Sequence, residues 1–275
     1  MNGFKSVEQL PEDARGHLAD LVLVLADNKR LLGIRYSDWI LGAPSVEAGI
    51  SCSAMAQDEW GHARILYAML RDFGLDPVAL EHEREASGYR NCQLLDEPAR
   101  GWPALLALNL LLDTALSVQF DALRESRFEP VHYKVRKLLD EERFHFTHGE
   151  GWTARLAMTE NGRAALLDSF EPAWEQCLRW FGPSQDPPAR CLAEAGIVGA
   201  TPDELRARWL ERVGPVVETA GLDLARGSGG AWSSRIEPAW EGWSSGRRRG
   251  PGSEGPDEDT LARVRGDRNR ALLLD

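Results

Sequence analysis

Strand signals and long apolar runs are both scarce in this sequence of 275 residues. The longest apolar runs, such as residues 21–26, are too short to span a bilayer, and the N-terminus lacks the apolar core of a signal peptide. The four cysteines are scattered without C-x-x-C spacing, which favours free thiols in a reducing cytoplasm. We therefore expect a soluble, cytoplasmic protein that does not enter a membrane.

Signatures of nucleotide and nucleic-acid binding are also missing. A net charge of −11 argues against general nucleic-acid binding, because phosphate contacts need a positive surface. No P-loop, dinucleotide-binding glycine fingerprint or nucleophile elbow occurs in the sequence. If the protein carries out redox chemistry, its electrons must therefore come from another protein.

Apolar residues at helical spacing are what the sequence does contain, within a composition that is 43% hydrophobic. The run Gly42-Ala43-Pro44 interrupts the first long helical pattern, and Ser45 can cap the helix that follows. Residues 75–100 are mixed and polar, as in the long link between two helical hairpins. These patterns predict an all-α protein with helices at residues 15–41, 45–72, 102–127, 131–158, 163–181 and 202–220.

Composition divides the chain into four parts. Residues 1–14 are a polar lead-in, and residues 15–225 form the helical domain, whose core bundle is residues 15–160. Residues 226–257 are rich in Gly, Ser, Pro and Arg, which predicts a mobile loop. The last part, residues 258–275, is predicted to be a short C-terminal helix.

Two motifs place a glutamate three residues before a histidine, Glu59-x-x-His62 and Glu142-x-x-His145. On a helix, both side chains of such a pair point the same way and can bind one metal ion. A single match is weak evidence, because 24 glutamates in 275 residues give each histidine about a one-in-eleven chance of a glutamate at this offset. A third match, ending at His132, crosses a predicted helix break and is set aside as coincidence. The alternative for His62 and His145 is an ordinary core or surface histidine.

The first predicted hairpin offers a carboxylate opposite Glu59. With a turn near Ala43, the residue level with Glu59 is Asp27. Asp38 is the rival, but it would lie roughly three helical turns from Glu59. Asp27 has an alternative interpretation as part of a solvated turn of helix, because polar and charged residues follow it.

The second predicted hairpin offers a carboxylate opposite Glu142. With a turn near Phe128, the residue level with Glu142 is Thr114, and Asp113 is its neighbour. Asp113 lies within an apolar run, where an unpaired carboxylate would cost roughly several kcal/mol or be protonated. A metal ion or a buried partner would explain an acid at this position.

Two helices that carry carboxylates and two that carry E-x-x-H motifs are the arrangement of di-iron and di-manganese carboxylate bundles. Carboxylates with one imidazole per metal suit two ions of Fe, or Mn, and leave open positions for dioxygen. We therefore predict a centre of two ions in which Glu59 and Glu142 are also catalytic. The predicted ligands are Asp27, Glu59, His62, Asp113, Glu142 and His145.

Four pieces of the sequence resemble the family of phenylacetyl-CoA ring 1,2-epoxidase subunits: LADN (25–28), SDWILGAP (37–44), AQDEWGHAR (56–64) and EERFH (141–145). The resemblance covers residues 15–160 well and extends more loosely to about 220. It implies a ferritin-like four-helix bundle with additional C-terminal helices, and a place in phenylacetate catabolism. The catalytic subunit of that family has a di-iron centre that epoxidises an aromatic acyl-CoA ring, whereas the structural subunit has lost ligands at its first E-x-x-H.

The resemblance assigns the metal motifs residue by residue. Glu59 and His62 match the first E-x-x-H of the catalytic subunit, and Glu142 and His145 match the second. Asp113 matches the acid on the third helix. The resemblance thereby implies a monooxygenase component that works with a homologous oxygenase subunit, a separate reductase and an acyl-CoA substrate.

The first helix departs from the catalytic pattern. The family position of the first carboxylate falls near Lys29 or Arg30, about one turn from Asp27, and a cation there would alter one metal site. Two other roles therefore stay open, a non-catalytic structural subunit and a ferritin-like di-metal protein with another oxidative task. Residues 247–249, three arginines, either meet a CoA phosphate or form a solvated run.

Overall fold

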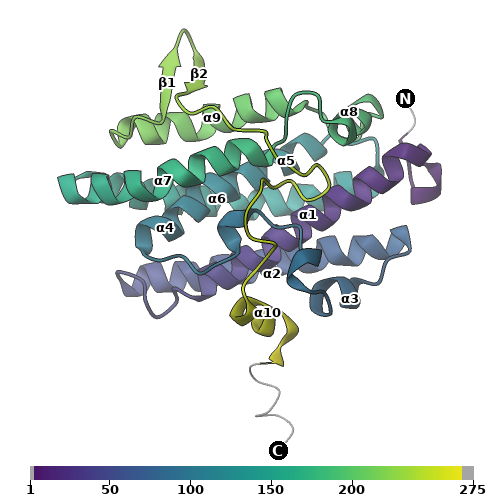
Figure 1. Ribbon diagram of the computed structural model, residues 1–275, viewed down its shortest axis with the longest axis horizontal. Coiled ribbons are helices and arrows are strands. Elements are labelled where there is room, and N and C mark those ends of the chain that lie inside the picture. Colours follow the sequence, from purple (N-terminus) through teal and green to yellow (C-terminus); the bar gives the residue numbers. More distant parts are fainter. Residues whose placement is uncertain (1–2, 268–275) are drawn as a thin grey trace, which may run out of the picture. The chain divides into compact units, whose positions relative to one another are not determined.

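Residues 3–267 are described by a computed structural model, which is mostly helical (Figure 1). The chain forms two compact units, each built from two separate segments. Unit 1 comprises residues 1–14 and 99–241, and unit 2 comprises residues 15–98 and 242–275. The mostly helical class predicted from the sequence is confirmed.

Unit 2 is organised around a helical hairpin of α1 (Glu12–Ser37), nearly all of which belongs to this unit, and α2 (Val46–Leu70). Ser45 caps α2 as predicted, since its hydroxyl accepts a 3.2 Å hydrogen bond from the Ala48 N–H. A 3₁₀ turn, η2 (Arg71–Phe73), follows α2 and ends at a glycine in the left-handed conformation, φ 78°. Both predicted helices of the first hairpin are therefore present.

The C-terminal segment completes unit 2. A buried guanidinium, that of Arg35 on α1, donates hydrogen bonds to Thr260 Oγ1 at 2.6 Å and to the Leu95 carbonyl at 2.9 Å. Arg249 and Asp96 form an ion pair at 2.5 Å whose side chains are nearly inaccessible to solvent. The smaller elements of this unit are α3 (Pro77–His82), η3 (Ala86–Gly88), η4 (Gln93–Leu95) and α10 (Glu258–Arg265).

The second hairpin lies in unit 1 and pairs an interrupted helix with the long helix α6 (Glu129–Ala157). The interrupted arm consists of α4 (Trp102–Ala107), a π-helical segment η5 (Leu108–Asp113) and α5 (Thr114–Leu123). This arm is apolar enough to cross a membrane by composition, but 89% of its most apolar window is buried inside the protein. Its burial is that of a core helix, as expected for a soluble protein.

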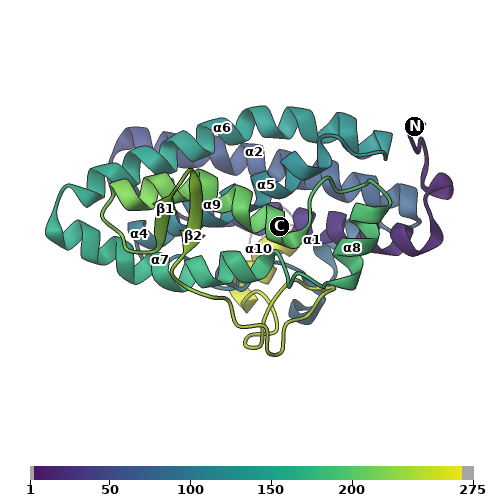
Figure 2. The same ribbon diagram turned by 90° about the horizontal axis from the view of Figure 1, so that it is seen from above.

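Further helices cover the second hairpin within unit 1 (Figure 2). The rings of Trp174 and Trp209 pack 4.5 Å apart between two of them, and the Trp209 indole donates a 2.9 Å hydrogen bond to the Leu111 carbonyl of η5. The helices of unit 1 outside the second hairpin are η1 (Val7–Gln9), α7 (Glu160–Trp180), α8 (Pro187–Glu194) and α9 (Pro202–Thr219). Unit 1 also contains a hairpin of β1 (Ala225–Ser228) with β2 (Ala231–Ser234).

The segment 226–257 has more structure than its composition indicates. Strands β1 and β2 pair in antiparallel register, with Ala225 opposite Ser234. The arginine run is not a solvated stretch, because Arg248 and Arg249 are both buried. Arg249 pairs with Asp96, so the guanidinium is held by a carboxylate of unit 2. Mobility of the segment stays a prediction, and the end of the predicted C-terminal helix, residues 268–275, lies outside the described residues.

Candidate metal centre

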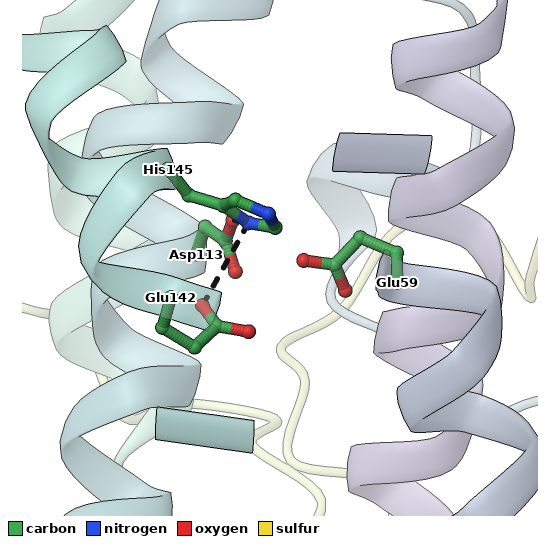
Figure 3. A group of neighbouring side chains, drawn as sticks. All are labelled: Glu59, Asp113, Glu142 and His145. Carbon is green, nitrogen blue, oxygen red and sulfur yellow. Dashed lines mark hydrogen bonds and ion pairs between the residues drawn. The ribbon is translucent and has the colours of Figure 1, made fainter. Parts of the chain in front are cut away.

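Three predicted ligands converge in unit 1. The Nδ1 atom of His145 lies 2.9 Å from Oδ2 of Asp113 and 3.9 Å from Oε2 of Glu142. All three side chains are almost fully buried, and Figure 3 shows them pointing toward one another. Ligands about 2.1 Å from one ion in octahedral geometry lie about 3 Å apart, so small movements would place these donors around a single metal. We call this group the trio.

A π-helix presents Asp113 to the trio. η5 ends at Asp113, and π-helical turns inside α-helices are rare and often occur at functional sites. The wider turn interrupts the regular hydrogen-bond pattern, and the Leu111 carbonyl accepts both the Thr114 N–H and the Trp209 indole N–H. His145 is thus a buried partner of the kind that the apolar run around Asp113 required.

A hydroxyl group on α5 orients the second carboxylate of the trio. Ser117 donates a 2.8 Å hydrogen bond to Oε2 of Glu142. Ser117 follows Asp113 by four residues, so both side chains face α6. Ser117 is not among the residues predicted from the sequence, although its spacing of four residues from Asp113 places both side chains on one face of a helix.

Unit 2 carries the other E-x-x-H motif, on α2. Glu59 and His62 are buried at 0% and 1% exposure, and Figure 3 also draws Glu59. The ammonium of Lys29, on α1, lies 2.9 Å from Oε1 of Glu59, and both side chains are 0% exposed. The residue that faces Glu59 across this hairpin is therefore a lysine.

Asp27 lies elsewhere on α1 and has several partners within unit 2. Its Oδ2 accepts hydrogen bonds from Nη1 of Arg84 at 2.9 Å and from the Arg90 N–H at 2.7 Å. Its Oδ1 accepts from Nη2 of Arg84 and, at 2.5 Å, from the hydroxyl of Tyr67. Burial and the Asp27 charge raise the pKa of Tyr67 well above its ordinary value, so the phenol keeps its proton. The ligand role of Asp27 stays a prediction, and the structure engages both its oxygens with protein donors.

The hairpin connection explains why Lys29, and not Asp27, faces Glu59. The Asp38 N–H bonds to the Ile34 carbonyl and the Ala43 N–H bonds to the Trp39 carbonyl, so helical turns continue past the end of α1. A shift of the turn centre by one residue changes the facing residue by two. Counting from the sequence placed the turn one residue too early.

A pocket of about 600 Å³ opens beside the trio, and its described lining residues all belong to unit 1. The trio, Thr114 and Ser117 form one part of the lining. Charged side chains form another part, with three guanidinium groups and two further carboxylates, and the remaining lining residues are Asn109, Leu139, Phe146 and Thr147. These charged residues are Arg124, Arg143, Arg212, Asp121 and Asp140.

Another histidine one turn beyond the trio lies among aromatic rings. The ring of His148 packs edge to face with Trp102 at 6.2 Å and lies 6.3 Å from the ring of Phe144. Burial and the nearby His145 charge lower the pKa of His148 to about 4, so this imidazole is neutral at physiological pH. His148 is not among the residues predicted from the sequence.

Two solved structures share this fold. One is a single-substitution variant of an R2-like ligand-binding oxidase with an aerobically reconstituted Mn/Fe cofactor. It is 12% identical, with a TM-score of 0.60 over 78% of this chain and 84% of that chain. The other is an R2-like ligand-binding oxidase with a reconstituted metal cofactor after photoconversion, also 12% identical, with a TM-score of 0.57 over 78% of this chain and 83% of that one. The predicted ferritin-like fold is thereby confirmed.

Family membership follows from the sequence as a whole. A comparison with curated proteins finds no match. The family model described as phenylacetic acid catabolic protein matches residues 1–241, which include every predicted metal ligand. The chain belongs to the phenylacetic acid catabolic protein family.

Proposed function

We propose that this chain is the metal-bearing component of an oxygenase that acts on an aromatic acyl-CoA. The buried trio of Asp113, Glu142 and His145 carries the proposal, because two carboxylates and an imidazole suit Fe or Mn. Membership of the phenylacetic acid catabolic family supports an aromatic acid as the source of the substrate. The ferritin-like fold, shared with oxidases that hold a Mn/Fe cofactor, supports the oxidative chemistry.

Glu59 and His62 are the proposed ligands from unit 2. In ferritin-like carboxylate proteins, E-x-x-H motifs from two helices project toward one centre of two metals, and this chain has both motifs buried. We assign Asp27 a structural role, since its oxygens accept hydrogen bonds from Arg84, Tyr67 and Arg90. Two iron ions, or manganese in place of iron, would supply the redox chemistry that activates dioxygen.

The remaining residues of the site bind, orient and exclude water. Ser117 fixes the carboxylate of Glu142 through Oε2, which keeps that ligand in one orientation. The trio is almost fully buried, and removal from bulk water strengthens electrostatic interactions inside the site. The guanidinium groups of Arg124, Arg143 and Arg212 suit the phosphates of an acyl-CoA at the charged part of the pocket.

Electrons would come from a separate reductase, because the sequence has no nucleotide-binding motif of its own. The family supports assembly with a homologous oxygenase subunit. We place the protein in the cytoplasm, where a reductase and acyl-CoA are both available.

One observation favours the alternative role of a non-catalytic structural subunit. Lys29 faces Glu59 at 2.9 Å, where a metal-binding bundle of this type has a carboxylate. A buried ion pair at this position would keep the hairpin of unit 2 folded without a metal. A ferritin-like protein with another oxidative task is the third candidate.

Metal content and activity together test the proposal. The purified protein is expected to retain iron and, with a reductase, dioxygen and a panel of acyl-CoAs, to oxidise an aromatic one. Glu142→Ala should lose both properties, whereas Glu150→Ala, on the exposed face of the same helix, should keep them. If the wild type retains no metal and Glu142→Ala has no effect in the assembled complex, the structural role holds. If metal binds but no acyl-CoA reacts, the third candidate holds.

A further inference from the structure

The outer face of α6 brings solvent close to the trio. Glu142 and His145 are buried, whereas Phe144, which lies between them in the sequence, is 47% exposed. The ring of Phe144 packs edge to face against the ring of His145, with 6.3 Å between the ring centroids. A single aromatic side chain therefore connects the surface of unit 1 with a proposed metal ligand.

This short connection through α6 suits the delivery of electrons. An α-helix with its side chains is about 10–12 Å across. Because Glu142 and His145 lie on the buried face of α6 and Phe144 reaches solvent, a metal ion held by the trio is about one helix thickness from the outer face. Electrons tunnel between protein redox centres over such distances. The sequence has no nucleotide-binding motif, so the electrons must come from another protein.

The same face carries positive charge on an acidic protein. Residues 130–139 include Lys134, Arg136 and Lys137 and contain no acid, while the whole chain has a net charge of −11. Arg136 and Lys137 are exposed, and neither forms an ion pair within the part of the chain that the structure describes. Lys137 precedes Phe144 by seven residues, so both side chains lie on one side of α6. These charges are available to a negatively charged partner.

The size of this face fits a transient partner better than a permanent one. Between residues 133 and 144, the exposed large apolar side chains are Tyr133 and Phe144, and Asp140 and Glu141 lie between them. Permanent subunit interfaces bury about 2,000 Å² or more and are strongly apolar, whereas transient electron-transfer complexes bury less than about 1,200 Å². Two aromatic side chains among charges are typical of the smaller class.

We propose that the outer face of α6, residues 133–144, is the docking surface for an acidic electron-donor protein, and that electrons pass through Phe144 to His145. This inference rests on the proposed function, since it takes the trio as metal ligands. Each docking event transfers one electron. An iron–sulfur cluster of the donor is oxidised by one electron, one ferric ion is reduced to ferrous, and no covalent bond forms or breaks.

Binding of an acidic [2Fe–2S] ferredoxin tests the docking surface without any activity measurement. Calorimetric titration of the metal-free protein with the oxidised ferredoxin should show binding that weakens as the salt concentration rises. Arg136→Glu with Lys137→Glu should lower the affinity at low salt by at least about tenfold. Arg190→Glu with Arg226→Glu is the matched control, because it makes the same change of net charge at exposed positions on α8 and β1. The control should bind like the wild type.

Reduction of the iron-loaded protein by the reduced ferredoxin tests the electron route. The absorbance of the ferredoxin in a stopped-flow experiment gives the limiting rate constant at saturating donor, which does not depend on affinity. Phe144→Ala should lower this rate constant, whereas Phe144→Tyr keeps a ring against His145 and should retain it. Tyr133→Ala removes the other exposed ring of the face and should lower the affinity but not the limiting rate constant.

The outcomes separate the inference from the function on which it rests. A ferredoxin that does not bind the wild type, or binds the Arg136 and Lys137 double variant equally well, overturns the docking surface and leaves the proposed function standing. A Phe144→Ala protein with the limiting rate constant of the wild type overturns the electron route. If the wild type self-associates and the double variant is monomeric, the face is a contact between copies of the chain and the inference fails. A wild-type protein that retains no iron overturns the proposed function, and the inference with it.

Discussion

Ser117 donates a 2.8 Å hydrogen bond to Oε2 of Glu142, and both side chains line the pocket beside Asp113. Ser117→Ala removes the group that orients this carboxylate. Loss of such a partner lowers metal affinity by about 10- to 100-fold, and we expect Mn²⁺ binding in a titration to weaken by that factor. Ser126→Ala, which removes another buried hydroxyl away from the trio, should leave the affinity unchanged. Equal affinities in both variants would show that Ser117 does not orient Glu142.

Because α6 lies close to η5, alanine substitutions at two glycines of α6 should have opposite effects on the free energy of unfolding. A Cβ on Gly149 would overlap Oδ1 of Asn109 and lie 3.2 Å from Cβ of Leu110. Gly149→Ala should therefore lower the free energy of unfolding by about 1–3 kcal/mol, as overpacking does. Gly151, two residues along, has open space at this position, and Gly151→Ala should raise stability by about 0.5–1 kcal/mol. Denaturant titrations measure both values, and a stable Gly149→Ala protein would contradict the packing.

Substitution of Asp27 tests whether this residue stabilises the fold or binds a metal ion. Asp27→Asn breaks the buried pair with Arg84, which should cost about 3–5 kcal/mol of stability. Asp20→Asn breaks an ion pair with Arg90 in which Asp20 is 47% exposed, and it should cost less than about 1 kcal/mol. Metal content should match the wild type in both variants. A folded Asp27→Asn protein that has lost metal would restore Asp27 as a ligand.

The lowered pKa of His148 leads us to expect that the folded protein loses stability in acid. Burial holds its pKa at about 4 in the folded protein, below the ordinary value of 6.5. The unfolded state therefore binds more protons between these values, and stability falls as the pH drops from 6.5 to 4. His148→Phe keeps a ring against Trp102 and removes the titrating group, so it should flatten this part of the curve. Unfolding free energies at pH 8, 6 and 4.5 check the slope, and parallel curves for the two proteins would exclude His148 as its source.

The sequence predicted the helices better than the contacts across a hairpin. Apolar periodicity located each long helix to within a few residues, and Asp113 was identified because an acid in an apolar run needs a partner. The residue opposite Glu59 was missed, because turns of residues 38–43 shift the register by an amount that periodicity does not encode. The π-helical character of η5 was also missed. A run of leucines looks the same in an α-helix and a π-helix, and only the packing of Trp209 and α6 distinguishes them.

The interleaving of the two units has a consequence for how the protein is made. Arg35 bonds to Thr260 across 225 residues of sequence, and Asp96 pairs with Arg249 across 153. A ribosome that has released α1 and α2 must therefore still synthesise residues 99–241, the larger segment of unit 1, before the last partners of unit 2 exist. Contacts of such long range slow folding, and nascent hairpins that wait for them expose apolar surface. The helices that carry Lys29 and Glu59 are thus among the first to be synthesised, but their unit is among the last to gain all its stabilising contacts.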